Sequence, residues 1–259
     1  MYASNYFEEQ MLNLMRGQSI TAPSHLYLGL FLTNPTDTGT GGTEVSYSGY
    51  ARQEIAFSAP AAAGSGMKIQ NTAEITFPES AIDAGTVTYI GVFDAQSNGN
   101  MLLYAQLSTS LKIQPGVSPV FRAGSVSWTW SGNLSTYYKT AIMNTLRGTN
   151  CAGFSPYLAL CNGDPTGSGT EFSGGNYARI ACTMSAPSQQ VSGAAMSQNS
   201  AQVVSNVSTA AWGDLSHVAI CNASTSGNVF AVVALDVTYN LISGASVGFK
   251  AGRVQVSIN

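Results

Sequence analysis

The sequence predicts a mainly β protein made of two tandem antiparallel β-sandwich (jelly-roll-like) domains, each preceded by a short N-terminal α-helix. Three observations lead to this prediction. The chain repeats itself once, at a displacement of about 128 residues. One stretch at the start of each copy has apolar residues at helical spacing. The remainder consists of short apolar runs separated by turns rich in Gly, Thr and Asn, which is typical of sandwiches and barrels.

The internal repeat is visible as sequence blocks that return in the same order. Residues 27–36, YLGLFLTNPT, return as residues 157–166, YLALCNGDPT. Further matching blocks are 12–17 with 143–148, 49–52 with 176–179, 58–60 with 185–187, 85–95 with 213–223 and 121–124 with 249–252. We therefore assign residues 1–130 to the first domain and residues 131–259 to a second, divergent copy of it.

Each copy is expected to begin with a helix of about three turns. In the first copy Ser4 and Asn5 are N-cap candidates, and Gly17 is a C-terminal stop. The apolar stripes are Phe7, Met11, Leu14 and Met15 in the first copy and Tyr138, Ile142 and Leu146 in the second. A helix this short is marginal alone, so we expect it to dock on the edge or face of a sheet.

The rest of the first copy is expected to form strands over residues 25–32, 50–57, 73–77, 86–94, 101–107 and 124–130. Both faces of the strand at 86–94 are apolar, which predicts a central position in its sheet. Residues 94–100 have the composition of a hairpin loop. Residues 34–45 and 59–70, and the counterpart of the latter at 188–198, are interpreted as long loops that are functional or lie against a partner.

Composition excludes several classes of protein. Charged residues make up 9 % of the chain, against about 25 % in an average soluble protein, which favours a subunit packed against neighbours. The net charge is −3 and no basic stripe is present, so we expect no nucleic-acid partner. No apolar run approaches the roughly 18 residues of a membrane span. The N-terminus has no basic and apolar signal regions, so we expect no export by the general secretory route.

Groups that carry catalysis or bind metal do not form a recognisable site. His25 and His217 are the only histidines, and they occupy different positions of the repeat. No phosphate-binding loop, dinucleotide fingerprint or zinc-protease motif is present. Asp37 and Asp164 lie in loops with calcium-loop character, but these offer too few of the 6–8 oxygens that Ca²⁺ usually takes. We therefore expect no enzyme activity, no metal and no cofactor.

The four cysteines all lie in the second copy. Cys151, Cys161, Cys182 and Cys221 align with Ile20, Phe31, Ile55 and Phe93 of the first copy. Each thus replaces an apolar residue, and we interpret them as small buried hydrophobic side chains. A disulfide would need two of the sulfur atoms to face each other, and sequence leaves that alternative open.

Two groups of residues are candidate sites. Glu44 and Arg52 recur as Glu171 and Arg179, and we expect a structural Glu–Arg contact in each copy, or a bond from the glutamate to the loop that follows it. Trp128, Trp130, Tyr137 and Tyr138 gather where the copies meet. These aromatic residues either pack the copies together or contact a partner or glycan. The short linker around residues 131–134 predicts a fixed orientation of the copies.

The order of motifs in residues 4–130 resembles small virion proteins of tailed bacteriophages, of the tail fibre, minor tail or head-decoration type. The resemblance lies in YLGLFLTNPTDTGTGGTEVSYSGYARQEIAF, NTAEITFP, GTVTYIGVFDAQSNGNMLLYAQL and FRAGSVSWTW. The second copy departs from this pattern at Cys161, Gly163, Cys182 and Asn222. These departures leave open whether both copies bind the same partner.

The resemblance implies a structural component of the virion, in a tail, baseplate or fibre-attachment region, assembled in the bacterial host cytoplasm. Its partners would be other virion proteins of the tail, the baseplate, the portal-proximal region or the capsid. Phage assemblies are symmetric, so we expect a homo-oligomer, trimeric or hexameric. Two alternatives stay open: a head-decoration or head-fibre protein, and a carbohydrate-binding module that recognises a host surface glycan.

Overall fold

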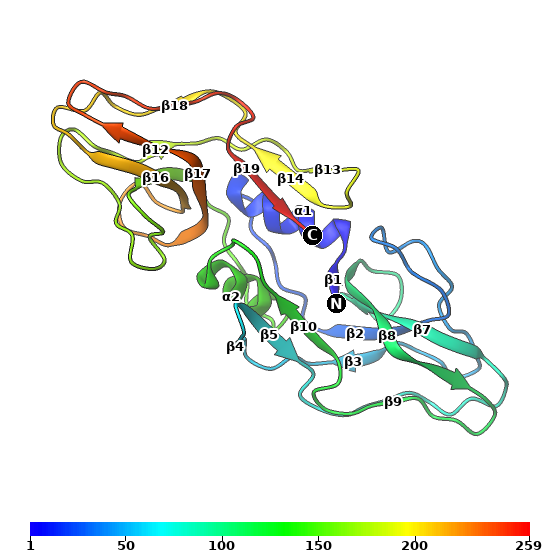
Figure 1. Ribbon diagram of the computed structural model, residues 1–259. Coiled ribbons are helices and arrows are strands. Elements are labelled where there is room, and N and C mark those ends of the chain that lie inside the picture. Colours follow the sequence, from blue (N-terminus) through cyan, green and yellow to red (C-terminus); the bar gives the residue numbers. More distant parts are fainter.

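The structure is a computed structural model that describes residues 1–259. Figure 1 shows three parts in a row: an outer lobe from each copy and a central body that holds both helices and both chain termini. Antiparallel strands dominate every part, and the two halves repeat the same series of elements. The predicted mainly β fold, with two tandem halves and short helices, is confirmed.

The first copy contains one large sheet and two small ones. The large sheet has the order β1-β8-β7-β2-β3, and the small sheets are β10-β5-β4 and β6-β9. The elements are β1 (Tyr2–Ala3), α1 (Asn5–Asn13), the 3₁₀ turn Leu14–Arg16, β2 (Leu26–Phe31), β3 (Gln53–Ile55), β4 (Ala61–Ala63), β5 (Gly66–Gln70), β6 (Ile75–Thr76), β7 (Gly85–Phe93), β8 (Met101–Ile113), β9 (Val120–Phe121) and β10 (Ser127–Trp130).

The second copy repeats this arrangement. Its sheets are β12-β11-β16-β17, β13-β14-β19 and β15-β18. The elements are α2 (Thr136–Thr145), β11 (Tyr157–Cys161), β12 (Ile180–Ala181), β13 (Ser188–Gln189), β14 (Ala195–Gln198), β15 (Val203–Val204), β16 (Gly213–Cys221), β17 (Val229–Leu241), β18 (Gly248–Phe249) and β19 (Gln255–Ile258). Corresponding strands pair in the same register, for example Trp128 with Ile69 and Val256 with Ser197.

Local sequence explains where the helices begin and end. The Ser4 hydroxyl accepts the Phe7 N–H at 3.3 Å, and Ser135 caps α2 in the same way through the Tyr138 N–H at 3.1 Å. Each cap satisfies a backbone donor that the first turn would leave unpaired. Gly17 ends the first helical segment with a φ of 78°, a left-handed conformation that glycine adopts without strain.

The strand predictions were right in the large sheets and wrong in part of the small ones. β7 lies between β2 and β8, as its two apolar faces predict. Residues 59–70 were expected to be a loop, but they contain the β4–β5 hairpin, and residues 188–198 contain β13 and β14. These strands are short and rich in Ala, Gly and Ser, residues of low strand propensity, so the sequence carries little strand signal there.

Each helix covers the small sheet of the other copy. In Figure 1, α1 lies beside β14 and β19 of the second copy, and α2 lies beside β5 and β10 of the first. The Glu8 carboxyl group on α1 accepts the Ala195 N–H of β14 at 3.0 Å. On the opposite side, the ring of Tyr138 on α2 packs against Trp130 with centroids 5.9 Å apart. Each helix also contacts the long strand of its own copy, α1 with β8 and α2 with β17, so each joins its own large sheet to the small sheet of the other copy. We call this reciprocal arrangement the helix exchange.

The segments that follow the helices meet at an approximate twofold axis. Ile20 and Cys151 occupy the same position of the repeat, and their backbones exchange two hydrogen bonds of 2.8 and 3.0 Å. Around them the Ala22 N–H donates to the Asn150 side chain, and the Gly153 N–H donates to the Ser19 hydroxyl. Each contact has a counterpart with the copies interchanged, which is the property of an isologous dimer interface.

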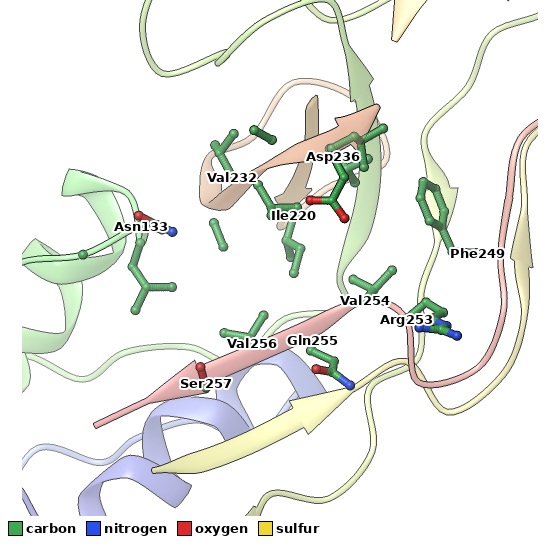
Figure 2. Close-up of a pocket in the computed structure, with 17 residues that line it drawn as sticks. Asn133, Ile220, Val232, Asp236, Phe249, Arg253, Val254, Gln255, Val256 and Ser257 are labelled. Carbon is green, nitrogen blue, oxygen red and sulfur yellow. The ribbon is translucent and has the colours of Figure 1, made fainter. Parts of the chain in front are cut away.

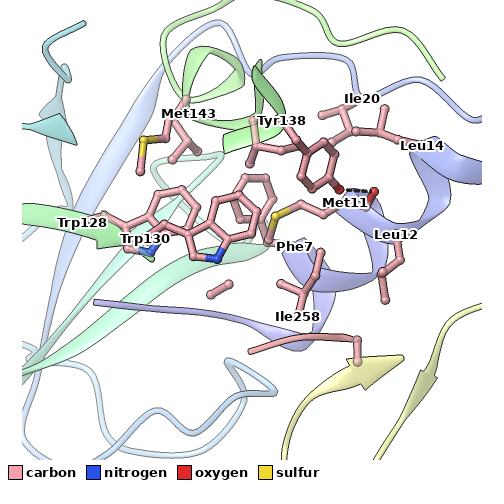
Figure 3. Close-up of a cluster of buried hydrophobic side chains, with 14 of the residues drawn as sticks. Phe7, Met11, Leu12, Leu14, Ile20, Trp128, Trp130, Tyr138, Met143 and Ile258 are labelled. Carbon is pink, nitrogen blue, oxygen red and sulfur yellow. Dashed lines mark hydrogen bonds between the residues drawn. The ribbon is translucent and has the colours of Figure 1, made fainter. Parts of the chain in front are cut away.

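One apolar core runs through the molecule. It contains 48 buried residues drawn from both copies, from Ala3 to Ile258. Figure 3 shows its middle, where side chains of α1, α2 and β10 meet and the Tyr138 hydroxyl donates to the Met11 carbonyl at 2.8 Å. A shared core of this kind leaves neither copy with a complete core of its own.

Candidate interaction surfaces

The predicted Glu–Arg contact is present in the first copy as part of a larger network. Arg52 donates through Nε and Nη2 to the two carboxylate oxygens of Glu44, each at 2.9 Å. The Tyr50 hydroxyl donates to Glu44 Oε1 at 3.0 Å and accepts the Leu30 N–H at 3.0 Å. A bidentate pair of this geometry is among the stronger polar contacts in proteins.

The second copy repeats the network atom for atom. Arg179 holds both carboxylate oxygens of Glu171 at 2.8 and 2.7 Å. The Tyr177 hydroxyl donates to Glu171 at 2.8 Å and accepts the Leu160 N–H at 3.0 Å. We call the set Glu44, Tyr50 and Arg52, and its equivalent Glu171, Tyr177 and Arg179, the Glu–Arg–Tyr clamp.

The clamp fixes the loops at the end of each large sheet. Arg52 Nη1 donates to the carbonyls of Asn98 at 2.8 Å and Ala95 at 3.3 Å, both in the β7–β8 hairpin. Arg179 binds the carbonyls of Ala223 and Ser226 in the matching β16–β17 hairpin. Each clamp therefore connects a hairpin to the end of the Thr- and Gly-rich segment that follows β2 or β11.

Burial keeps the two clamp tyrosines protonated. It raises the pKa of the Tyr50 and Tyr177 hydroxyls far above their ordinary value, so both remain donors. The hydrogen bond to Glu171 raises the pKa of Arg179. Sequence reasoning found the acid and the base but missed the tyrosine, although the shared Tyr-Ala-Arg triplet was a signal for it.

Three of the four aromatic residues at the junction are buried. Trp128, Trp130 and Tyr138 are 3 %, 7 % and 1 % exposed. The two indoles stack with centroids 5.2 Å apart, and Figure 3 shows them between the helices. Tyr137 is 46 % exposed and packs edge-on against Phe230 with centroids 5.5 Å apart. Of the proposed partner or glycan contacts, only Tyr137 presents an accessible ring. Trp130 and Tyr138 contact each other across the junction, and Trp128 is buried against Phe7 and Trp130.

The second copy contains a cavity of about 610 Å³ that the sequence did not reveal. It lies between the β16–β17 face and β19, and Figure 2 shows Val232 and Ile220 on one side and Val254 and Val256 on the other. Its charged lining residues are Asp236 and Arg253, which form no ion pair with each other. Its size falls within the roughly 300–1,000 Å³ of ligand pockets. We call it the copy-two cavity.

The cavity follows from replacement of large residues by small ones. The first copy has larger side chains at two matching positions, Trp128 where the second copy has Val256, and Leu103 where it has Ala231. In the first copy the Trp128 indole contacts Phe7, with ring centroids 6.1 Å apart. The repeat alignment carried this signal, but only the paired strands show that the replacements line one space.

The cysteines are free and unreactive in character. Cys161 lies opposite His217 on β16, and Cys221 lies opposite Tyr157 on β11, so the two thiols stand at different ends of the paired strands. Burial raises the pKa of Cys161 to about 12 and that of Cys221 to about 11. A thiol held protonated in this way is a poor nucleophile and a poor metal ligand. No group of three or more His, Cys, Asp or Glu side chains converges in a way that would hold a metal ion.

Neither α1 nor α2 has the length and apolar character that a helix needs to span a membrane.

Comparison with known families gives a match that covers both copies. The sequence matches the family described as Podophage GP4 fiber I protein gp80 over residues 2–129 and again over residues 133–257. The two matched segments coincide with the two halves of the structure, since each contains one helix, one large sheet and the smaller sheets. No curated protein matches the sequence.

Proposed function

We propose, from the premise that the chain belongs to the Podophage GP4 fiber I protein gp80 family, that it is a structural subunit of a tailed-phage fibre. The observation that carries the proposal is the family match over both copies, which together span nearly the whole chain. The geometry supports a structural role, because the shared features are a common core and two clamps that hold loops in place.

We further propose that the clamped loops dock the protein to other virion proteins. The Thr- and Gly-rich segment 34–45 and the β7–β8 hairpin meet at one end of the first lobe, and their counterparts meet at the equivalent end of the second. Loops held by a rigid scaffold are the usual carriers of binding function. A tandem duplication offers two such surfaces related by an approximate twofold axis, which suits a subunit in a symmetric particle.

The oligomeric state is proposed as a trimer or hexamer, because phage fibres and tails assemble around a symmetry axis. Multi-angle light scattering of the purified chain would measure it. A purified chain that remains monomeric in this measurement would contradict this part of the proposal.

The experiment that tests the proposed function is location in the particle. Mass spectrometry of purified virions should detect the protein, and electron cryo-microscopy or a gold-labelled tag should place it on a fibre attached to the tail. Density on the capsid would instead support a head-decoration role. Absence from purified, infectious particles would contradict a virion function.

A further inference from the structure

The outer edge of β17 is an open row of backbone donors and acceptors. β17 ends the sheet order β12-β11-β16-β17, and on its outer side it forms only a single bridge, between Leu134 and Ala231. Beyond Ala231 the strand exposes Val233, Val237 and Tyr239, which are 54 to 58 % exposed. An open edge that carries apolar side chains is the surface to which an extended segment of another chain adds.

This apolar edge belongs to the second copy alone. The matching residues of β8 are Ala105, Thr109 and Leu111, and none of them is a large exposed apolar side chain. Unpaired apolar edges favour aggregation, and proteins normally protect them with charge, Pro or a covering segment. An edge that is more apolar in one copy than in the other therefore indicates that something covers it.

The copy-two cavity opens beside the same edge. Val233 and Ala234 of β17 contribute to its lining. Addition of a strand to a sheet edge commonly combines backbone hydrogen bonds with a pocket for a side chain, and here the two features lie side by side. In the first copy the matching space receives the Trp128 indole, which shows the kind of group that this space accommodates.

The open edge also continues an interface that already exists. The linker residue Leu134 forms the first rung against β17, and the next residue, Ser135, donates its N–H to the Phe230 carbonyl at 2.8 Å. A segment added beyond Ala231 would extend this ladder along the same edge. Every second side chain of the added segment would lie on the same side of the sheet as the copy-two cavity, where it could enter the cavity.

We propose that an extended segment of another virion protein adds to the outer edge of β17 and places an aromatic side chain in the copy-two cavity. The proposal rests on the proposed function, because the partner is a neighbour in the particle. A different protein is favoured over a second copy of this chain. The cavity matches a space that holds an indole in the first copy, and this chain has no exposed indole or phenyl ring to offer. Its three Trp side chains are buried and all of its Phe side chains are buried or partly buried.

Photo-cross-linking in assembled particles tests the proposal. The photoreactive residue p-benzoylphenylalanine would replace Val233, with a control substitution at Ile82, an exposed residue of the other lobe. We expect a cross-link from position 233 to a segment of another virion protein that contains Trp, Tyr or Phe. Position 82 should give no such cross-link.

If position 233 forms cross-links only to copies of this chain, the inference is overturned and the proposed function stays intact. The same holds if particles that contain the protein show no cross-link from position 233. Particles that lack the protein would overturn both.

A filled cavity provides the second test. Val256→Trp places in the copy-two cavity the side chain that the first copy already has, and the cross-link yield from position 233 should then fall at least tenfold. Thermal unfolding reports whether the variant is folded. If Val256→Trp does not fold, Ala231→Leu replaces it in the test, because Leu is the residue of the first copy at that position. An unchanged yield in a folded variant would overturn the inference.

Discussion

The two copies share a scaffold but differ in how its interior is filled. Both keep the Glu–Arg–Tyr clamp with the same partners and nearly the same distances. In the first copy the small sheet carries Trp128 and Ile69, and the space beside the large sheet is filled. In the second copy the matching residues are Val256 and Ser197, and the copy-two cavity remains. The comparison separates what the fold requires, the clamp and the exchanged helices, from what was free to change.

The largest expected effect comes from separation of the copies. A chain of residues 1–131 lacks α2, so the face of its small sheet with Trp130 would meet water and its core would be incomplete. We expect this half-chain to lose cooperative unfolding, and co-expression with residues 132–259 to restore a 1:1 complex. Near-ultraviolet circular dichroism and light scattering would measure both. A half-chain that is a folded monomer would show that the helix exchange is dispensable.

The next effect tests the filled core. Trp128→Val gives the first copy the residue of the second, and the loss of a buried indole should lower the free energy of unfolding by about 3 kcal/mol. Urea denaturation measures the change. Thr129→Val, at the exposed neighbouring position of the same strand, is the matched control and should change stability by less than about 0.5 kcal/mol. An equal response of the two variants would mean that Trp128 is not part of a close-packed core.

These comparisons also show where sequence reasoning succeeded and where it failed. The repeat predicted the tandem halves, apolar spacing predicted both helices, and the two apolar faces of residues 86–94 predicted a central strand. The exchange of helices was out of reach, because periodicity identifies the apolar face of a helix but not the sheet that covers it. The same limit applied to Trp128 and Trp130. Sequence showed them near the junction, but only packing shows which aromatic side chains lie inside it.

Disruption of the clamp should lower stability by an intermediate amount, and by different amounts in the two copies. Arg52→Met leaves the partly buried Glu44 carboxylate without its partner, which should lower the free energy of unfolding by about 2 kcal/mol. Arg52 also lies 3.3 Å from the centroid of the Phe93 ring, where the second copy has Cys221. Arg179→Met should therefore be milder by about 1 kcal/mol.

Chemical denaturation of the two clamp variants and of the double variant would measure this difference. The same cycle repeated with Phe93→Leu serves as the control, because it should remove the difference between the copies. A larger loss for Arg179→Met than for Arg52→Met would contradict the contribution of the ring.

The last effect appears only at high pH and concerns one helix position that differs in charge between the copies. Glu8 on α1 and Lys139 on α2 are equivalent and are 1 % and 3 % exposed. Burial raises the pKa of Glu8 from 4.5 to about 8, and one of its oxygens has no hydrogen-bond partner. Burial lowers the pKa of Lys139 from 10.5. The two residues should therefore give opposite pH dependences.

A carboxyl whose pKa is higher in the folded state stabilises the fold below the unfolded pKa of 4.5 and loses that contribution as the pH rises to about 8. Glu8→Gln keeps an acceptor for the Ala195 N–H without the charge. The variant should match the parent near pH 4 and exceed its stability by about 2 kcal/mol at pH 9.

Lys139→Gln is the matched control. Its advantage over the parent should instead shrink as the pH rises toward 10.5, because the buried amine then loses its charge. Thermal unfolding from pH 4 to pH 10 would separate the two trends, and parallel curves for Glu8→Gln and the parent would mean that folding does not shift the pKa of Glu8.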